Sequence, residues 1–359
     1  ILVCLVGSEM CIRDSIGGDE FVVVLPNIDS ESQLIDTIED ILSLFNHPFE
    51  VSNNESLRIS TSIGVARYPQ DGQDSETLLK NADTAMYLAK KNGRNGYAFY
   101  SPDLTDKSVS HVRIQSALHE AIEKNQLHLV YQPQYNLSTN ELVGVEALLR
   151  WQHPDLGMIS PADFIPIAEK TGLIKNIGKW VLKQACLQGR AWLDDGIEFG
   201  KLAVNVSALQ LQQSNFISKL EGILQETKFP TYRLELEITE SFLLIDPQQA
   251  IASLNSLREL GIEISLDDFG TGYSSLSYLK GLPINKLKID RSFVSDLPGD
   301  TDSNAIVNAI IAMGKSLSLK VIAEGIETEE QAQYLYEHDC VYGQGFLFSA
   351  PVRAENLFK

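Results

Sequence analysis

The pattern of hydrophobic and polar positions divides the chain into two parts with different periods. In the first part, apolar or alternating runs at 21–26, 57–69 and 96–100 predict strands, and the stretches 31–45 and 75–91 have helical spacing. Only a few elements are available there to enclose a core. The first part therefore predicts a small α+β unit.

A polar segment separates this unit from the rest of the chain. Residues 101–110 contain one proline and show no period, which is typical of a linker. After it, short β-branched runs alternate with amphipathic helical stretches; the runs are 128–133, 142–150, 202–207, 233–240, 263–268, 286–290, 320–325 and 341–346. Eight such runs predict a (β/α)₈ TIM-like barrel of the α/β class, with two open sheets as the alternative.

Nearly every one of these runs carries a polar or charged residue close to its C-terminal end. They are Gln132, Glu146, Arg150, Asn205, Glu237, Glu240, Asp267, Asp268, Lys288, Asp290, Glu324, Glu327 and Gln344. In a barrel these positions converge on one face, where the active site of such folds lies. A lone acid at a strand end usually caps the next helix. So many converging carboxylates would repel one another, and they imply bound cations.

The types of side chain narrow the choice of cation. The donors are hard oxygen ligands with no His or Cys among them, which favours Mg²⁺ or Mn²⁺ over Zn²⁺. Adjacent carboxylates such as Asp267 and Asp268 can serve two ions about 4 Å apart, and Lys288 is then placed to orient or deprotonate an attacking water. Two such ions with a positioned water predict in-line attack of that water on a phosphodiester. A one-metal enolase-like or aldol site is the alternative from the same rim.

Composition and charge exclude several classes of partner and compartment. The net charge of −19 argues against binding to a nucleic-acid polymer. The four cysteines show no pairing or metal-type spacing, which predicts reduced thiols in a cytoplasmic protein. The opening run ILVCLV is too short to span a membrane. It also lacks the basic segment and the cleavage site of a secretory signal.

The second part of the chain contains many short motifs in a fixed order. They read YQP (131–133), EAL (146–148), NVS (205–207), ELEITE (235–240), DDFGTGYSSL (267–276), KLKID (286–290), AEGIET (323–328) and YGQGF (342–346). From about residue 113 to the end, the chain resembles the EAL family of cyclic-di-GMP phosphodiesterases. The resemblance implies hydrolysis of one phosphodiester of cyclic-di-GMP to linear pGpG, in bacterial signalling.

The same resemblance implies a role for each residue of the rim. Two divalent ions, Mg²⁺ or Mn²⁺, are expected: the first on Glu146, Asn205, Glu237 and Asp267, the second on Asp267 and Asp268. Glu324 would support the second ion through water, and Glu324 and Lys288 are the candidate bases. The dinucleotide contacts would come from Gln132, Arg150, Glu327 and Gln344, although Gln344 could instead cap a turn and Arg150 pair with a surface acid. Glu240 would brace the loop 268–275, which is expected to couple the site to a homodimer.

The first part resembles a second signalling family. The motif GGDEF at 17–21 and the pattern AD-x-AMY-x-AK-x-x-GRN at 82–95 resemble the GGDEF family of diguanylate cyclases. The resemblance implies an active-site hairpin at Gly17, Gly18, Asp19 and Glu20, with phosphate contacts from Lys90 and Arg94 and GTP as a ligand in the full-length protein. Position 15 is Ser where that family usually has Arg, and no RxxD inhibitory motif is present.

The opening residues match nothing expected of a cyclase. The metal-binding Asp, the guanine-contacting Asn and Asp, and the first strand of the sheet are expected ahead of the hairpin and are missing from this sequence. We therefore expect residues 1–15 to be a non-native leader, with a divergent strand as the alternative. The expected domains are a partial GGDEF domain at 16–100, a linker at 101–112 and an EAL domain at 113–359. On this view the chain makes no cyclic-di-GMP from GTP.

Three functions are consistent with the motifs. The chain could be an active phosphodiesterase, a catalytically silent module that binds cyclic-di-GMP or GTP, or part of a bifunctional parent whose cyclase half is active. Silent members typically lose a metal ligand or the lysine. Here every expected position carries the expected residue, which favours the enzyme.

Overall fold

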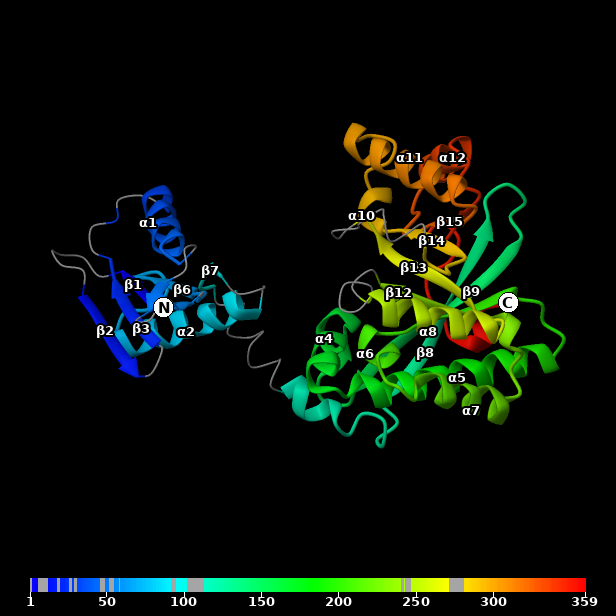
Figure 1. Cartoon of the computed structure of the whole chain (residues 1–359), viewed down its shortest axis with the longest axis horizontal. Coiled ribbons are helices and arrows are strands. Elements are labelled where there is room, and N and C mark those ends of the chain that lie inside the picture. The colour runs from blue at the N-terminus through cyan, green and yellow to red at the C-terminus, as the bar shows by residue number, and fades with distance from the viewer. Residues whose placement is uncertain are drawn as a thin grey trace. The chain divides into compact units, whose positions relative to one another are not determined.

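Figure 1 shows the computed structural model of the whole chain. The structure describes residues 2–5, 12–17, 20–25, 28, 31–45, 49–51, 55–57, 59–91, 95–101, 113–239, 242, 247–270 and 281–359. The chain forms two compact units, Ile1–Ile114 and Gln115–Lys359. Each unit is described by itself.

The first unit is built on a five-stranded sheet with the order β2-β3-β1-β6-β7. Its strands are β1 (Leu2–Leu5), β2 (Ile12–Gly17), β3 (Glu20–Val24), β6 (Ser62–Arg67) and β7 (Gly96–Phe99). The helices are α1 (Glu31–Ser43) and α2 (Ser75–Lys91), and a separate hairpin joins β4 (Phe49–Val51) to β5 (Glu55–Leu57). These elements confirm the predicted α+β character.

Helix α2 lies directly on strand β6 because Gly64 leaves room for it. A Cβ atom at Gly64 would lie 2.0 Å from the carbonyl oxygen of Ala82 and 2.2 Å from the nitrogen of Met86. The buried face of α2 consists of Leu78, Asn81, Ala82, Ala85, Met86 and Ala89. Small residues at this contact let the helix backbone approach the strand closely.

The opening of the chain differs from the expectation of a missing first strand. Leu2–Leu5 is strand β1, which pairs in parallel with β3 and with β6 and so lies in the middle of the sheet. An apolar run such as ILVCLV suits a strand buried between two others. The prediction that the sheet lacks an opening strand is therefore wrong. Strand formation does not test whether residues 1–15 are native, so the domain boundaries stay a prediction.

The second unit is a closed barrel. Its eight strands are β8 (Leu127–Asn136), β9 (Leu142–His153), β11 (Lys201–Asn205), β12 (Leu234–Thr239), β13 (Glu263–Phe269), β14 (Lys286–Ile289), β15 (Lys320–Ala323) and β16 (Tyr342–Gly343). They pair in the order β9-β11-β12-β13-β14-β15-β16-β8, and the pairing of β8 with β9 closes the ring. A short strand β10 (Gly157–Ile159) extends β9. The prediction of a TIM-like barrel is confirmed.

Strand β8 runs opposite to the other seven strands. It pairs antiparallel with both β9 and β16, whereas the other neighbours in the ring are parallel. The turn at 137–141 joins β8 to β9 without a helix, and a turn this short can connect only antiparallel strands. The expectation that every strand brings its C-terminal end to one rim is therefore wrong for β8.

Helices follow or flank the barrel strands, as Figure 1 shows. They are α4 (Pro161–Thr171), α5 (Ile174–Asp194), α6 (Ala208–Leu211), α7 (Phe216–Thr227), α8 (Pro247–Glu259), α10 (Arg291–Val294), α11 (Thr301–Ser316) and α12 (Glu329–Glu337), with 3₁₀ turns at Thr231–Arg233 and Ala354–Asn356. None of the described helices has both the length and the apolar character needed to cross a bilayer.

Candidate functional site

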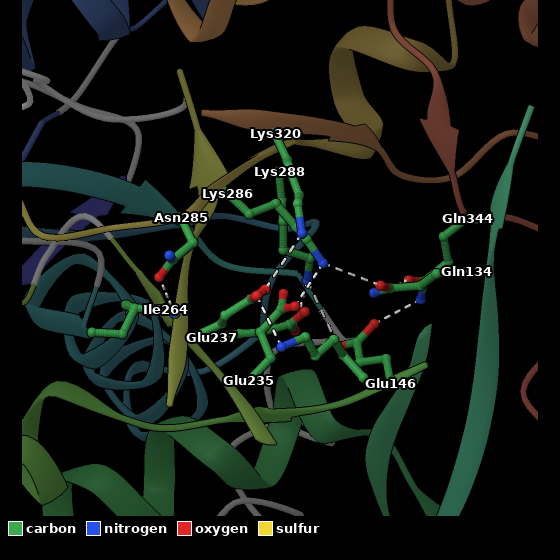
Figure 2. Close-up of polar contacts among 12 residues, drawn as sticks. Gln134, Glu146, Glu235, Glu237, Ile264, Asn285, Lys286, Lys288, Lys320 and Gln344 are labelled. Atoms are coloured by element: carbon green, nitrogen blue, oxygen red, sulfur yellow. Dashed lines mark hydrogen bonds and ion pairs between the residues drawn. The ribbon is translucent and has the colours of Figure 1, made fainter. Parts of the chain in front are cut away.

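The interior of the barrel is polar because successive strand residues point to opposite sides. In β12, Leu234, Leu236 and Ile238 belong to the apolar core, while the alternate residues Glu235 and Glu237 make contacts across the barrel. Strand β14 repeats the pattern, with Leu287 and Ile289 alternating with Lys286 and Lys288. Figure 2 shows these acids and lysines meeting inside the ring. The lysines of one strand therefore neutralise the acids of another.

Lys288 lies among four carboxylates. Its Nζ atom is 2.7 Å from Glu237 Oε2, 3.1 Å from Asp267 Oδ1, 2.5 Å from Glu324 Oε1 and 3.8 Å from Glu146 Oε1. The Lys288 side chain is only 1% exposed. The acids come from β9, β12, β13 and the end of β15, so the barrel brings together side chains that are far apart in the sequence. The predicted convergence of these residues is confirmed.

The cluster shifts the pKa values of its members in different directions. Burial favours a neutral Lys288, but Asp267, Glu146 and the other two acids hold its pKa well above the ordinary value. Burial, with the neighbouring charges of Glu146 and Asp267, raises the pKa of Glu237 well above its ordinary value. Burial raises the pKa of Glu324 to about 8, against the opposing charge of Lys288. The rim therefore holds a charged lysine beside two acids, Glu237 and Glu324, that resist ionisation.

Glu146 stays ionised because several donors meet it. Its Oε1 accepts a hydrogen bond from Asn205 Nδ2 at 2.7 Å, and its Oε2 accepts one from Gln344 Nε2 at 2.6 Å. Burial works against the charged form, yet Lys288 and the two amides hold the pKa of Glu146 below its ordinary value. Gln344 Nε2 also donates to Gln132 Oε1 at 2.9 Å. The structure thus brings Asn205, Gln132 and Gln344 together around Glu146, while their predicted roles as metal ligand and dinucleotide contacts stay predictions.

The two adjacent aspartates occupy different environments. Asp267 is buried and contacts Lys288, whereas Asp268 is exposed and has a φ of 53°. A non-glycine residue in this left-handed region is strained, and such strain gathers at functional sites. Partial burial of its carboxyl group and the neighbouring charges of Asp267 and Asp290 raise the pKa of Asp268 to about 6. Asp290 itself caps α10, since its side chain accepts a hydrogen bond from Ser292 N.

A pocket of about 210 Å³ opens onto these residues. Its lining is Gln132, Glu146, Leu148, Arg291, Glu324, Gly325, Glu327, Gln344, Gly345 and Phe346. Arg291 Nη2 lies 3.3 Å from Glu327 Oε1, and Phe346 is 59% exposed. Charged, amide and aromatic groups therefore surround one pocket at the carboxyl rim.

Several predicted residues lie apart from the pocket or outside the described part of the chain. Arg150 pairs across the strands with His128 and donates to the carbonyl oxygen of Leu149 at 2.9 Å, and it does not line this pocket. Lys90 is exposed in the last turn of α2, and Gly17 pairs with Glu20 at the predicted hairpin. Gly18, Asp19, Arg94, Glu240 and residues 271–275 of the predicted loop lie outside the described residues.

Sequence reasoning missed four polar residues and one aromatic residue of the site region. Gln134, Glu235 and Lys286 lie inside the barrel, and Arg291 and Phe346 line the pocket. Alternation alone could have found the first three, because Gln132 and Gln134, Glu235 and Glu237, and Lys286 and Lys288 are each two residues apart on one strand. Arg291 and Phe346 follow strand ends and carry no comparable signal.

The chemistry of the donors fits a hard divalent cation. Glu237 Oε1 is buried and accepts no hydrogen bond from the residues that the structure describes, and the carboxylates of Glu146, Asp267 and Glu324 lie around the same lysine, Lys288. In the described part of the chain, no group of three or more His, Cys, Asp or Glu residues has the spacing of a metal-binding site as it stands. The ammonium of Lys288 is placed among the acids instead. The acids around Lys288 have the oxygen donors that a hard divalent cation prefers.

A closed barrel with this rim defines a TIM-barrel protein with a carboxylate site at the carboxyl ends of its strands. The EAL domain family matches residues 115–351, and the family "Diguanylate cyclase, GGDEF domain" matches residues 4–96. The first match covers more than half of the chain, so the chain belongs to the EAL domain family.

Relatives with curated names match along nearly the whole chain. The bifunctional diguanylate cyclase/cyclic di-GMP phosphodiesterase MucR of Pseudomonas aeruginosa is 44% identical over 342 residues, which is 95% of this chain and 50% of MucR. The cyclic di-GMP phosphodiesterase PdeR of Escherichia coli is 38% identical over 354 residues, 99% of this chain and 53% of PdeR. The chain thus spans about half the length of these relatives.

One solved structure matches the second unit throughout its own length. The structure titled "PaMucR Phosphodiesterase, c-di-GMP complex" is 47% identical, with a TM-score of 0.66. It covers 68% of this chain, and this chain covers 100% of it.

Proposed function

We propose that this chain hydrolyses one phosphodiester bond of cyclic-di-GMP and releases linear pGpG. The observation that carries the proposal is the ring of Glu146, Glu237, Asp267 and Glu324 around Lys288 at the carboxyl rim of the barrel. Two further points support it: relatives that match along this chain are named cyclic di-GMP phosphodiesterases, and one solved relative is a complex with c-di-GMP.

Two divalent ions, Mg²⁺ or Mn²⁺, belong to the proposed site. Glu146, Asn205, Glu237 and Asp267 would hold the first, and Asp267 and Asp268 the second, with support from Glu324. Such ions lower the pKa of water and offset negative charge on a phosphate. The chain's own part is to place hard oxygen donors around that position and to keep Glu146 ionised through Asn205 and Gln344.

Of the two candidate bases, Glu324 fits proton transfer better than Lys288. The pKa of Lys288 lies well above its ordinary value, so its amine stays protonated and cannot take a proton at neutral pH. The pKa of Glu324 is raised to about 8, within the range that suits a base or acid at neutral pH. Lys288 then donates hydrogen bonds and offsets negative charge on the phosphate.

The pocket at the rim supplies the proposed contacts to the dinucleotide. Gln132, Gln344 and Glu327 line it, together with Arg291 and Phe346. An exposed aromatic ring offers a face on which a nucleobase can stack. Arg150 stays a candidate for the more distant phosphate, since it lies on β9 with Glu146, on the same side of the strand.

Incubation of the purified chain with cyclic-di-GMP and Mn²⁺, followed by nucleotide chromatography, tests the proposal. We expect pGpG in the complete mixture, and none after chelation of the metal or in the Glu146→Ala variant. The main alternative is a silent module that binds cyclic-di-GMP. Tight binding of cyclic-di-GMP without any pGpG would support that alternative and contradict the proposed function.

Three narrower proposals concern the surroundings of the enzyme. We propose a homodimer formed through the EAL unit, GTP binding by the GGDEF unit within a longer protein, and a cytoplasmic location. Light scattering of the chain at several concentrations tests the first, and titration of a longer protein with GTP tests the second. A monomeric mass at all concentrations would contradict the dimer.

A further inference from the structure

A chain of buried polar side chains runs from the lower interior of the barrel to Glu146. Lys286 Nζ lies 2.7 Å from Glu235 Oε2 and 3.5 Å from Gln134 Oε1. Gln134 Nε2 donates to Gln344 Oε1 at 3.0 Å, and Gln344 Nε2 donates to Glu146 Oε2 at 2.6 Å. Figure 2 shows this path across the barrel. None of these five residues is more than 7% exposed.

The two ends of the path determine how both amides are oriented. An ammonium can only donate, so Lys286 attracts the oxygen end of the Gln134 amide even at 3.5 Å. An ionised carboxylate can only accept, so Glu146 requires the nitrogen end of the Gln344 amide. With the ends set in this way, Gln134 must donate to Gln344 and not the reverse. In each hydrogen bond along the path, the donor therefore lies on the side of Lys286 and the acceptor on the side of Glu146.

The barrel also makes room for Gln134. Gly144 is its partner across the strands, and a Cβ atom at Gly144 would lie 2.9 Å from Gln134 Oε1. The Gln134 side chain is fully buried, so no solvent competes for its amide. A buried amide with one satisfied orientation is costly to reverse.

We propose that Gln134 and Lys286 are positioning residues that set the amide orientation of Gln344 and thereby hold the Glu146 carboxylate in place. Neither residue lines the pocket that is proposed to bind the substrate. The proposal rests on the proposed function for the meaning of Glu146 as a ligand. The direction of the hydrogen bonds between Gln134, Gln344 and Glu146 can be measured without following hydrolysis.

The Gln134→Glu variant reverses one link while keeping the side-chain shape. The carboxylate keeps its contact with Lys286 but can no longer donate to Gln344 Oε1. Gln344 must then turn its amide, which places its oxygen against Glu146. We expect the affinity for Mn²⁺, measured by calorimetry, to fall about 10-fold to 100-fold, the range for residues that orient metal ligands.

The Gln126→Glu variant is the matched control. Gln126 is also a buried glutamine of the barrel, and its Oε1 accepts a hydrogen bond from Trp151 Nε1 at 3.1 Å. A carboxylate can still accept that bond, so Mn²⁺ affinity should stay at the wild-type value. A fall of equal size in both variants would show a general effect of a buried carboxylate and would overturn the proposal.

Side-chain amide NMR reads the orientation directly. In the wild type, Gln344 Nε2 donates to both Gln132 and Glu146, so its two protons should exchange slowly with water. Their signals are assigned by their loss in Gln344→Met. We expect Gln134→Glu to shift these signals and speed their exchange, and Gln126→Glu to leave them unchanged. Unchanged Gln344 signals in a folded Gln134→Glu would overturn the proposal.

A second variant tests the proposal if Gln134→Glu does not fold. The double variant Glu235→Leu/Lys286→Met removes the ammonium together with its buried partner, a replacement that proteins often tolerate. Gln134 then loses the group that selects its orientation, and we expect weaker Mn²⁺ binding and faster exchange at Gln344. Wild-type values would remove Lys286 from the path. Failure of the wild-type chain to hydrolyse cyclic-di-GMP would contradict the proposed function alone, since neither readout needs turnover.

Discussion

At the scale of single residues, Lys288 is the centre of the site. It is the cation that makes a group of buried acids compatible with folding, because each acid would otherwise repel the others. The same contacts place its ammonium beside the position where a phosphate and divalent ions are proposed to bind. Lys288 is thus expected to matter for stability and for turnover by the same electrostatic means.

Replacing Lys288 separates turnover from binding. We expect Lys288→Ala to lower turnover by about 10²-fold or more, the range for a lost proton-transfer or electrostatic group. Binding of cyclic-di-GMP should remain, because Gln132, Glu327 and Gln344 are untouched. Lys183→Ala is the control, since Lys183 forms an exposed ion pair with Glu226. Rates from chromatography and affinities from calorimetry check the prediction, and near-wild-type turnover in Lys288→Ala would remove Lys288 from the chemistry.

The raised pKa values of the acids predict a dependence of stability on pH. In the folded chain, burial raises the pKa of Glu324 to about 8, and partial burial with neighbouring acids raises the pKa of Asp268 to about 6. The folded state therefore holds more protons than the unfolded state, and these two groups lower stability as the pH rises toward 8. Divalent ions should reverse the trend, because they bind the ionised carboxylates.

Melting temperatures from pH 5 to pH 8, in chelator and in excess Mg²⁺, check this prediction. We expect the stabilisation by Mg²⁺ to grow with pH across the range set by Asp268 and Glu324. Equal stabilisation by Mg²⁺ at every pH would show that these acids are not the ligands. Glu146→Ala should reduce the stabilisation at all pH values.

At the scale of elements, the barrel strands explain what the sequence could predict. Runs such as LELEIT and KLKI carry a charged residue close to their C-terminal ends, and parallel strands bring these ends together, so Glu146, Glu237, Asp267 and Lys288 could be placed at one site. The prediction considered only the C-terminal ends of the runs. Glu235 and Lys286 lie near the start of their predicted runs and Gln134 lies beyond the end of 128–133, so all three were missed although they follow the same alternation.

The reversed direction of strand β8 was missed because a helix was expected between β8 and β9, as between the other strands. The stretch after Asn136 forms a turn in which Asn136 Oδ1 accepts hydrogen bonds from Ser138 N and Thr139 N, and Asn140 has a φ of 55°. These are signals of a hairpin, not of a helix. Gln132 still reaches the site, because it pairs directly with Glu146 across the hairpin.

Close packing of α2 on β6 gives a prediction at the same scale. Gly64→Ala places a methyl group against backbone atoms of α2, so we expect a loss of about 1–3 kcal/mol in the free energy of unfolding of the first unit. Gly222→Ala is the control, because no described atom outside its own helix α7 lies within 4 Å of the added Cβ, and alanine favours a helix by about 0.5–1 kcal/mol. Urea unfolding followed by circular dichroism measures both. A stable Gly64→Ala would contradict the close contact.

At the scale of the whole molecule, two units with different architectures share one chain. The first has the hairpin expected of the GGDEF resemblance, and the second is the closed barrel that carries the acids and Lys288. The opening strand β1 was expected only as the alternative to a non-native leader, and its pairing with β3 and β6 shows its place in the sheet. The central claim concerns the second unit, where water is proposed to attack a phosphorus atom of cyclic-di-GMP.

Hydrolysis in water enriched in ¹⁸O tests that claim most directly. If water attacks the phosphorus atom, the pGpG formed by the chain with Mn²⁺ carries one heavy oxygen on its terminal phosphate, as mass spectrometry would show. Glu146→Ala and Lys288→Ala should form far less of this product, while Lys183→Ala should form as much as the wild type. Intact cyclic-di-GMP bound to the wild-type chain, or pGpG without the heavy oxygen, would contradict the account.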